Sequence, residues 1–248
     1  MREDREKLRK AKRIKFFIRL GAVLTVVLLL VFFAKAPMFN VTSYEVEGNS
    51  YYTADEIRTM ADCKVGENIF IGTDYKDMKE RLSRDPYFKT VKFSVSLPST
   101  VTIRLEERDQ AMAFVYGENY IVVSSDTTVL RKTSVDPKIP VIRGINLTEL
   151  SIGSTLGVED ELFLTEAVDI IKAMNENDMY FKEIYIEKNQ VTCYILDNLK
   201  VEGKTANIIE VLESGDLHSV VEELFSREIE RGVITVSGEK YISYSPKL

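Results

Sequence analysis

The residue patterns that could support catalysis lie near the carboxyl end of the chain. Ser237 and Lys240 fit the S-x-x-K pattern, in which the serine is a nucleophile. Penicillin-binding proteins, in which this pattern occurs, place that serine at a helix start and also carry S-D-N and K-T-G motifs, which this sequence lacks. Gly203-Lys204-Thr205 is similar to the end of a phosphate-binding loop, but Asn198 stands where the first glycine of that loop belongs. Neither pattern predicts an enzyme.

The thiols and the imidazole could bind a metal only if the fold brought them together. Cys63 and Cys193 are the two cysteines, and His218 is the single histidine. Their positions lack the close ligand pairs of zinc sites. A disulfide would require two separate domains to dock, and a disulfide-stapled scaffold would carry more cysteines. We therefore expect two buried free thiols, no metal and no cofactor.

The segment that decides where the rest of the chain lies relative to a membrane is apolar. It is Phe16–Ala34, and it carries no charge from Leu20 onward. As a helix it would be about 28 Å long, close to the roughly 30 Å core of a bilayer. Residues 1–19 hold nine basic and three acidic residues, whereas the whole chain has a net charge of −6. Because basic residues stay cytoplasmic beside a membrane span, we expect the amino terminus inside and the carboxyl terminus outside.

A cleaved signal peptide and a buried core helix are the alternatives for this segment. Ala34-Lys35-Ala36 is typical of a small-residue cleavage site, but Pro37 would follow the cut and the basic lead-in is long. A core helix would show a polar face, which Leu20–Ala34 lacks. We favour a retained anchor in contact with the lipid bilayer.

The residues after the anchor are acidic, which argues against nucleic-acid binding. A strand at Val41–Val46 precedes two helices, the first beginning at the capping box of Thr53 and Glu56 and the second at Asp74. The alternating segments Phe88–Leu97 and Val101–Leu105 then form a hairpin with one buried face, which includes Leu97. This order favours a three-stranded sheet with two helices on one face.

Short motifs follow one another through this region. They are Phe39-Asn-Val41, Val46-Glu-Gly48-Asn49, Glu56-Ile57, Gly66-Glu-Asn68-Ile-Phe70, Asp85-Pro86-Tyr-Phe88, Leu97-Pro98-Ser-Thr100 and Glu107-Arg108. In this order, directly after an apolar segment, they resemble the FtsQ/DivIB family of bacterial cell-division proteins, whose outer part begins with a POTRA domain. One position departs from the family, which commonly has a proline where this chain has Gln110.

Past Gln110 the resemblance continues more weakly. A helix is predicted over Glu159–Met174, and a helical stretch over Thr205–Ile229 should break at Ser214-Gly215 and end at Gly232. Further strands are predicted at Asn119–Val123, Val129–Lys132, Phe181–Glu187, Gln190–Leu196, Val233–Val236 and Tyr241–Tyr244.

The resemblance implies an α+β protein with a single N-terminal transmembrane helix, a POTRA domain of β-α-α-β-β order and a mixed β-rich domain with helices. The expected boundaries are a cytoplasmic basic tail at 1–15, a transmembrane helix at 16–36, a POTRA domain at 37–109 and a β domain at 110–248. The implied function is a non-catalytic bitopic scaffold of the divisome at the septum of the cell membrane. The alternative is an anchored envelope adaptor or cell-wall enzyme accessory whose POTRA domain guides a client.

Sheet edges are the surfaces that could serve this function, because an open edge recruits a partner strand. The implied partners are DivIC/FtsB-like and FtsL-like division proteins, with an indirect link to septal peptidoglycan synthesis. The resemblance implies that the last strand and the adjacent helix bind these partners, and by position Val233–Val236 and Tyr241–Tyr244 would correspond. The candidate residues are Val233, Ile234, Val236, Tyr241, Ile242 and Tyr244. The same residues could instead close the core of the domain, and alternation would allow one face to do each.

Overall fold

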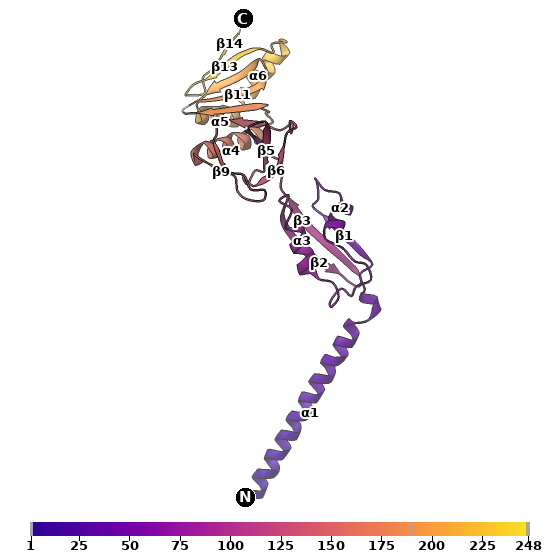
Figure 1. The fold of residues 1–248 in the computed structure, drawn as a ribbon. Coiled ribbons are helices and arrows are strands. Elements are labelled where there is room, and N and C mark those ends of the chain that lie inside the picture. The colour runs from indigo at the N-terminus through magenta and orange to yellow at the C-terminus, as the bar shows by residue number, and fades with distance from the viewer. Residues whose placement is uncertain (1, 189, 247–248) are drawn as a thin grey trace. The chain divides into compact units, whose positions relative to one another are not determined.

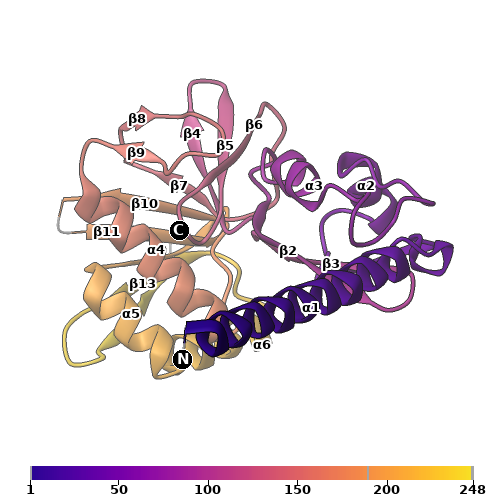
Figure 2. The same cartoon turned by 90° about the horizontal axis from the view of Figure 1, so that it is seen from below.

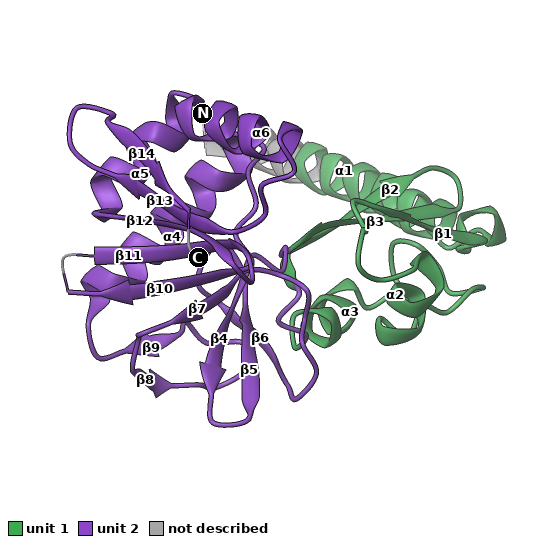
Figure 3. Ribbon diagram, turned by 90° about the horizontal axis from the view of Figure 1, so that it is seen from above, with its two compact units in different colours: residues 1–84, 88–107 green, residues 85–87, 108–248 purple. Residues whose placement is uncertain are grey.

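The computed structural model describes residues 2–188 and 190–246, and side-chain surroundings from residue 15 onward. The chain divides into two compact units, one of residues 1–84 and 88–107 and the other of residues 85–87 and 108–248 (Figure 3). The first unit starts with α1 (Arg2–Ala34), followed by a 3₁₀ turn at Pro37–Phe39 (Figure 1). Within α1, Lys15–Ala34 has a mean hydropathy of 2.6 and is not buried, so this helix is long and apolar enough to cross a membrane.

The first unit contains a three-stranded sheet in the order β1-β3-β2, where β1 is parallel and β2 antiparallel to β3. Both helices, α2 and α3, lie on the same face of this sheet, as predicted (Figure 3). The bounds are β1 Ser43–Glu47, α2 Ala54–Met60, α3 Tyr75–Leu82, β2 Phe88–Ser96 and β3 Thr100–Glu107.

Both helices of this unit start where the sequence predicts, and local hydrogen bonds cap their first turns. The Thr53 backbone N–H donates to the Glu56 carboxylate at 2.8 Å, and the Glu56 N–H donates back to the Thr53 hydroxyl at 3.3 Å. Asp74 accepts from two backbone N–H groups at the start of α3. One prediction is wrong: the alternating face is not buried throughout, because Val95 near the end of β2 is 39% exposed and Leu97, just after the strand, is 62% exposed.

The described part of the second unit contains a nine-stranded mixed sheet in the order β14-β13-β12-β11-β10-β7-β4-β5-β6. Helices α4 and α5 pack against one face of it, and α6 packs against α5 (Figure 2). The bounds are β4 Met112–Tyr116, β5 Asn119–Val123, β6 Val129–Thr133, β7 Val141–Arg143, β8 Leu147–Glu149, β9 Gly157–Val158, α4 Glu161–Glu176, β10 Glu183–Glu187, β11 Gln190–Leu196, β12 Leu199–Gly203, α5 Thr205–Glu213, α6 Asp216–Ser226, β13 Gly232–Val236 and β14 Ile242–Ser245.

The helical stretch of this unit breaks at the predicted place, because Gly215 adopts a φ of 74° between α5 and α6. The predicted end at Gly232 is wrong. Helix α6 ends at Ser226, and Gly232 is already the first residue of β13. A side chain at Gly232 would meet the Tyr244 ring at 2.5 Å, so this glycine allows close packing between β13 and β14.

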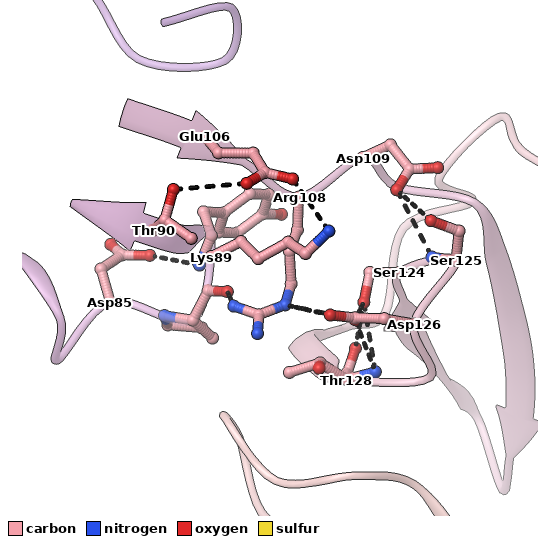
Figure 4. A network of polar contacts seen from close by, with 12 residues as sticks. Asp85, Lys89, Thr90, Glu106, Arg108, Asp109, Ser124, Ser125, Asp126 and Thr128 are labelled. Carbon is pink, nitrogen blue, oxygen red and sulfur yellow. Dashed lines mark hydrogen bonds and ion pairs between the residues drawn. The ribbon is translucent and has the colours of Figure 1, made fainter. Parts of the chain in front are cut away.

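A polar network lies at the start of the second unit (Figure 4). The Arg108 guanidinium donates to the Asp126 carboxylate at 2.9 Å and to the backbone carbonyl of Pro86 at 2.9 Å. The Arg108 backbone N–H also donates to the Tyr87 carbonyl at 2.7 Å. These bonds attach residues 85–87 to the second unit, although their neighbours on both sides in the sequence belong to the first.

Candidate partner-binding site

The last two strands, β13 and β14, form an antiparallel pair at one end of the nine-stranded sheet. Ile234 and Val236 of β13 are 0% and 3% exposed and belong to the core of the second unit. Their side chains are therefore occupied by packing. Val233 is half-buried on the same strand. The predicted site residues on β13 therefore pack into the core next to the edge strand β14.

The residues of and beside β14 are more accessible. Ile242 and Tyr244 are half-buried and pack against the same core, while Tyr241 precedes the strand and is 65% exposed. The Tyr244 hydroxyl donates to the Arg231 carbonyl at 2.8 Å, which fixes the ring across the first residues of β13. The structure therefore brings five of the six predicted site residues into one strand pair and places Tyr241 in the turn.

The hydrogen-bond register shows which backbone groups of β14 face outward. The Ser237 N–H donates to the Tyr241 carbonyl at 2.9 Å, so these two residues form a hydrogen-bonded pair. In an antiparallel ladder such pairs alternate, which makes Thr235 and Ser243 the next hydrogen-bonded pair. The N–H and C=O groups of Ile242 and Tyr244 therefore point away from β13, toward the open edge.

Charge distinguishes β14 from the other edge strands of the two larger sheets. Natural edge strands commonly carry charged residues that prevent unwanted pairing. Strand β1 contains Glu45 and Glu47, β2 contains two lysines, and β6 contains Arg131 and Lys132. Strand β14 reads Ile-Ser-Tyr-Ser and contains no charge. Among these four edges in the described residues, β14 is the one without electrostatic protection.

A shallow groove lies at the Tyr244 end of β14 and was not apparent from the sequence. Its volume is about 690 Å³. It forms because the parallel pairing of β12 with β13 brings Asn198 close to Gly232, whose N–H donates to the Asn198 carbonyl at 2.8 Å. No local pattern could have predicted this long-range contact. The lining residues are Asn198, Glu228, Ile229, Glu230, Arg231, Tyr244 and Pro246.

The other residues considered for chemistry do not have the surroundings that their motifs require. Ser237 and Lys240 both lie in the turn between β13 and β14, where Lys240 has a φ of 56°, so the serine is not at a helix start. Cys63 is half-buried in the first unit and Cys193 is fully buried in the second, and neither forms a disulfide. Burial raises the pKa of the Cys63 thiol to about 11 and also raises that of Cys193. Within the described ranges, no three His, Cys, Asp or Glu side chains form a metal-binding group.

Comparison with known proteins agrees with this architecture. Residues 39–108 match the FtsQ-type POTRA domain family. The chain is 28% identical over 243 residues to the cell division protein DivIB of Clostridium botulinum strain Hall, covering 93% of this chain and 91% of that protein. It is 25% identical over 212 residues to DivIB of Clostridium acetobutylicum, with coverage of 85% and 82%, and 19% identical over 241 residues to DivIB of Bacillus subtilis, with coverage of 96% and 86%.

A solved extracytoplasmic domain of DivIB from Geobacillus stearothermophilus also aligns, with 13% identity and a TM-score of 0.32, over 50% of this chain and 99% of that one. The fold is that of an α+β protein with an FtsQ-type POTRA domain and a β-rich domain, and the residues that the structure describes include one candidate membrane-spanning helix. The chain is thus similar to the FtsQ/DivIB family of bacterial cell-division proteins, in its FtsQ-type POTRA region at residues 39–108 and, at lower identity, over most of its length.

Proposed function

We propose that this protein is a non-catalytic scaffold of the bacterial divisome that uses the open edge of β14 to bind a strand of a partner protein. The observation that carries the proposal is the uncharged, outward-facing backbone of β14 at the end of the sheet. Backbone hydrogen bonds would supply affinity, and the neighbouring groove would accept a side chain of the added strand. The proposed partners are DivIC/FtsB-like and FtsL-like proteins, which would link this chain indirectly to septal peptidoglycan synthesis.

The proposed organisation follows from the charge of the sequence. Residues 1–15 form a cytoplasmic tail, residues 16–36 cross the cell membrane, and a POTRA domain at 37–109 and a β domain at 110–248 lie outside, at the septum. The basic residues before the apolar part of α1 favour this orientation. Protease added to intact protoplasts should therefore remove nearly all of the chain. Full protection of the chain would contradict the orientation.

The binding experiment compares two substitutions at one position. In Ile242→Pro the outward N–H is lost, whereas in Ile242→Ala the side chain is shortened and that N–H is kept. Proline is tolerated on an edge strand when its N–H position faces outward, so β14 should still pair with β13. Calorimetry of the full-length protein in nanodiscs with the ectodomain of a DivIC-like protein would measure the dissociation constant.

We expect Ile242→Pro to weaken binding roughly tenfold or more relative to Ile242→Ala, because it removes a backbone hydrogen bond and obstructs the incoming strand. Tyr241→Lys should also weaken binding without affecting the fold, since this side chain is exposed. Equal affinities of the two Ile242 variants, with β14 still protected from hydrogen exchange, would place the partner elsewhere.

A further inference from the structure

Four large apolar side chains are exposed on the first unit outside α1 and close to its end. Met38, Phe70, Ile71 and Leu97 are 55%, 52%, 57% and 62% exposed. They come from three separate segments: the 3₁₀ turn, the loop between α2 and α3, and the turn between β2 and β3. We call these four residues the juxtahelical patch. Large apolar side chains exposed together at one end of a unit indicate an interaction site.

The loop that carries Phe70 and Ile71 is attached directly to the end of α1. The Asn68 side-chain nitrogen donates to the Ala34 carbonyl at 2.9 Å, in the last residue of that helix. The Asn68 side-chain oxygen accepts from the backbone N–H groups of Phe70 and Ile71 at 3.0 and 3.2 Å. One asparagine therefore holds the apolar tip of the loop against the helix end.

A chain of aromatic contacts continues this attachment. The ring of Phe33, in the last turn of α1, is 5.3 Å from that of Phe39, and the ring of Phe39 is 5.3 Å from that of Phe70. The apolar span of α1 ends at Ala34. Because the interfacial layer on each side of a bilayer is about 5–8 Å thick, Phe70 is held within reach of that layer.

Leu97 is brought to the same end of the unit by the pairing of β1 with β3. The Thr42 N–H donates to the Ser99 carbonyl at 2.8 Å, and the hydroxyls of these two residues lie 2.9 Å apart. Thr42 follows the 3₁₀ turn closely, so the turn between β2 and β3 lies at the end of the unit where α1 leaves (Figure 1). Lys35 is exposed at this end, where its ammonium could meet lipid phosphates.

We propose that the juxtahelical patch inserts into the interfacial layer of the bilayer and holds the POTRA domain against the membrane surface. The occupant is lipid because the loop that carries Phe70 is bonded to the last residue of α1, and because Phe70 and the lipid-facing Phe33 both contact the buried ring of Phe39. This proposal rests on the membrane anchoring proposed above. The consequence is that the domain would have a restricted orientation and would not move freely on a tether.

The chain contains no tryptophan, so single tryptophans can report the depth of the patch without background. Phe70→Trp and Leu97→Trp probe two of its segments in the full-length protein, reconstituted in vesicles of phosphatidylglycerol and phosphatidylethanolamine. Tyr51→Trp is the matched control, because Tyr51 is also aromatic and 49% exposed but lies beyond the other end of β1. Phe32→Trp, within α1, reports whether the anchor itself is in the membrane.

Lipids brominated close to the headgroup should quench Phe70→Trp and Leu97→Trp roughly twofold or more, because interfacial side chains lie about 5–10 Å into the headgroup and acyl boundary. Tyr51→Trp should instead be quenched by aqueous acrylamide. If Phe32→Trp is quenched by lipid while both patch probes respond only to acrylamide, the patch is solvent-exposed and this inference is overturned while the anchor stands.

Two other outcomes would also overturn the inference. Patch probes shielded from both quenchers would indicate a protein cover, either a second copy or a partner. Absence of lipid quenching at Phe32→Trp would overturn the anchoring and the inference together. As a further check, Ile71→Trp can report on the patch after two of its other side chains are removed. Phe70→Ser combined with Leu97→Ser should increase the quenching of Ile71→Trp by acrylamide without changing hydrogen exchange in β3. Both changed side chains are exposed, so the fold should tolerate them.

Discussion

Replacing Gly48 by alanine should destabilise the POTRA domain strongly. Gly48 follows β1 with a φ of 86°, and a Cβ at this position would lie 2.1 Å from the backbone oxygen of Leu105. Leu105 belongs to the central strand β3 and is 8% exposed, so its carbonyl cannot move without shifting the sheet. Left-handed strain contributes about 1–2 kcal/mol and the steric overlap about 1–3 kcal/mol. We expect a total cost of about 3 kcal/mol.

Gly66→Ala is the control that separates these two contributions. Gly66 has a similar φ of 94°, but a Cβ there would meet no atom within 4 Å. Its replacement should therefore cost only the backbone strain, about 1 kcal/mol. The difference between the two variants, about 2 kcal/mol, measures the close approach of Gly48 to Leu105.

Hydrogen exchange measured by mass spectrometry on the full chain can assign this loss to one domain. In peptides that cover β3, exchange through unfolding should be about 30-fold faster in Gly48→Ala than in Gly66→Ala, because 1.4 kcal/mol corresponds to a factor of ten. Peptides covering β12 in the second unit serve as an internal reference and should not change. Equal exchange in the two variants would refute the argument, since it would show that the Leu105 carbonyl imposes no steric restriction.

Two further predictions concern titratable groups. Burial would raise the pKa of Asp126, but hydrogen bonds from Ser124 and Arg108 outweigh it and hold that pKa at about 2, below its ordinary value of 3.8. The stabilisation is therefore present above that ordinary value and is lost as the pH falls from about 4 toward 2; it is about 1 kcal/mol after allowance for the partly exposed carboxylate. Urea unfolding of the second unit should show this loss. Asp126→Asn should reduce the pH dependence in that window by about this amount, and Asp136 and Glu149, whose pKa values are also lowered, should account for part of the remainder. An unchanged profile would show that Asp126 does not contribute. At about pH 8, iodoacetamide should modify Cys63 slowly and Cys193 hardly at all in the folded protein, because the raised pKa values of the two thiols leave little thiolate. In urea both thiols should react quickly. Fast modification of Cys193 in the folded protein would contradict its burial.

The features that the sequence predicted well depend on interactions between residues close in the chain. The capping box at Thr53 and Glu56, the cap at Asp74 and the break at Gly215 are each determined within a few residues. Such interactions are the same in an isolated segment and in the folded domain. The start of each helix could therefore be inferred before any tertiary contact was known.

The features that the sequence missed depend on distant partners. Strand β4 was not predicted, and its place beside β7 arises from a parallel pairing with Val141 and Ile142. The exposure of Leu97 was also missed, because alternation shows which side chains share a face but not where the core beneath that face ends. Gly232 was assigned to a helix end because glycine is typical of that position, whereas its contact with Tyr244 comes from strand pairing.

The candidate site shows the same division between local pattern and long-range order. Alternation alone left open whether the last two strands close the core or bind a partner. With the strand order known, Ile234 and Val236 are seen to be occupied by the core, so a partner could use only the other strand. There the side chains of Ile242 and Tyr244 pack inward while their N–H and C=O groups face the open edge. Substitutions that change side chains on β13 should therefore alter stability, and those that block the backbone of β14 should alter binding, which is a separation that side-chain patterns alone could not have indicated.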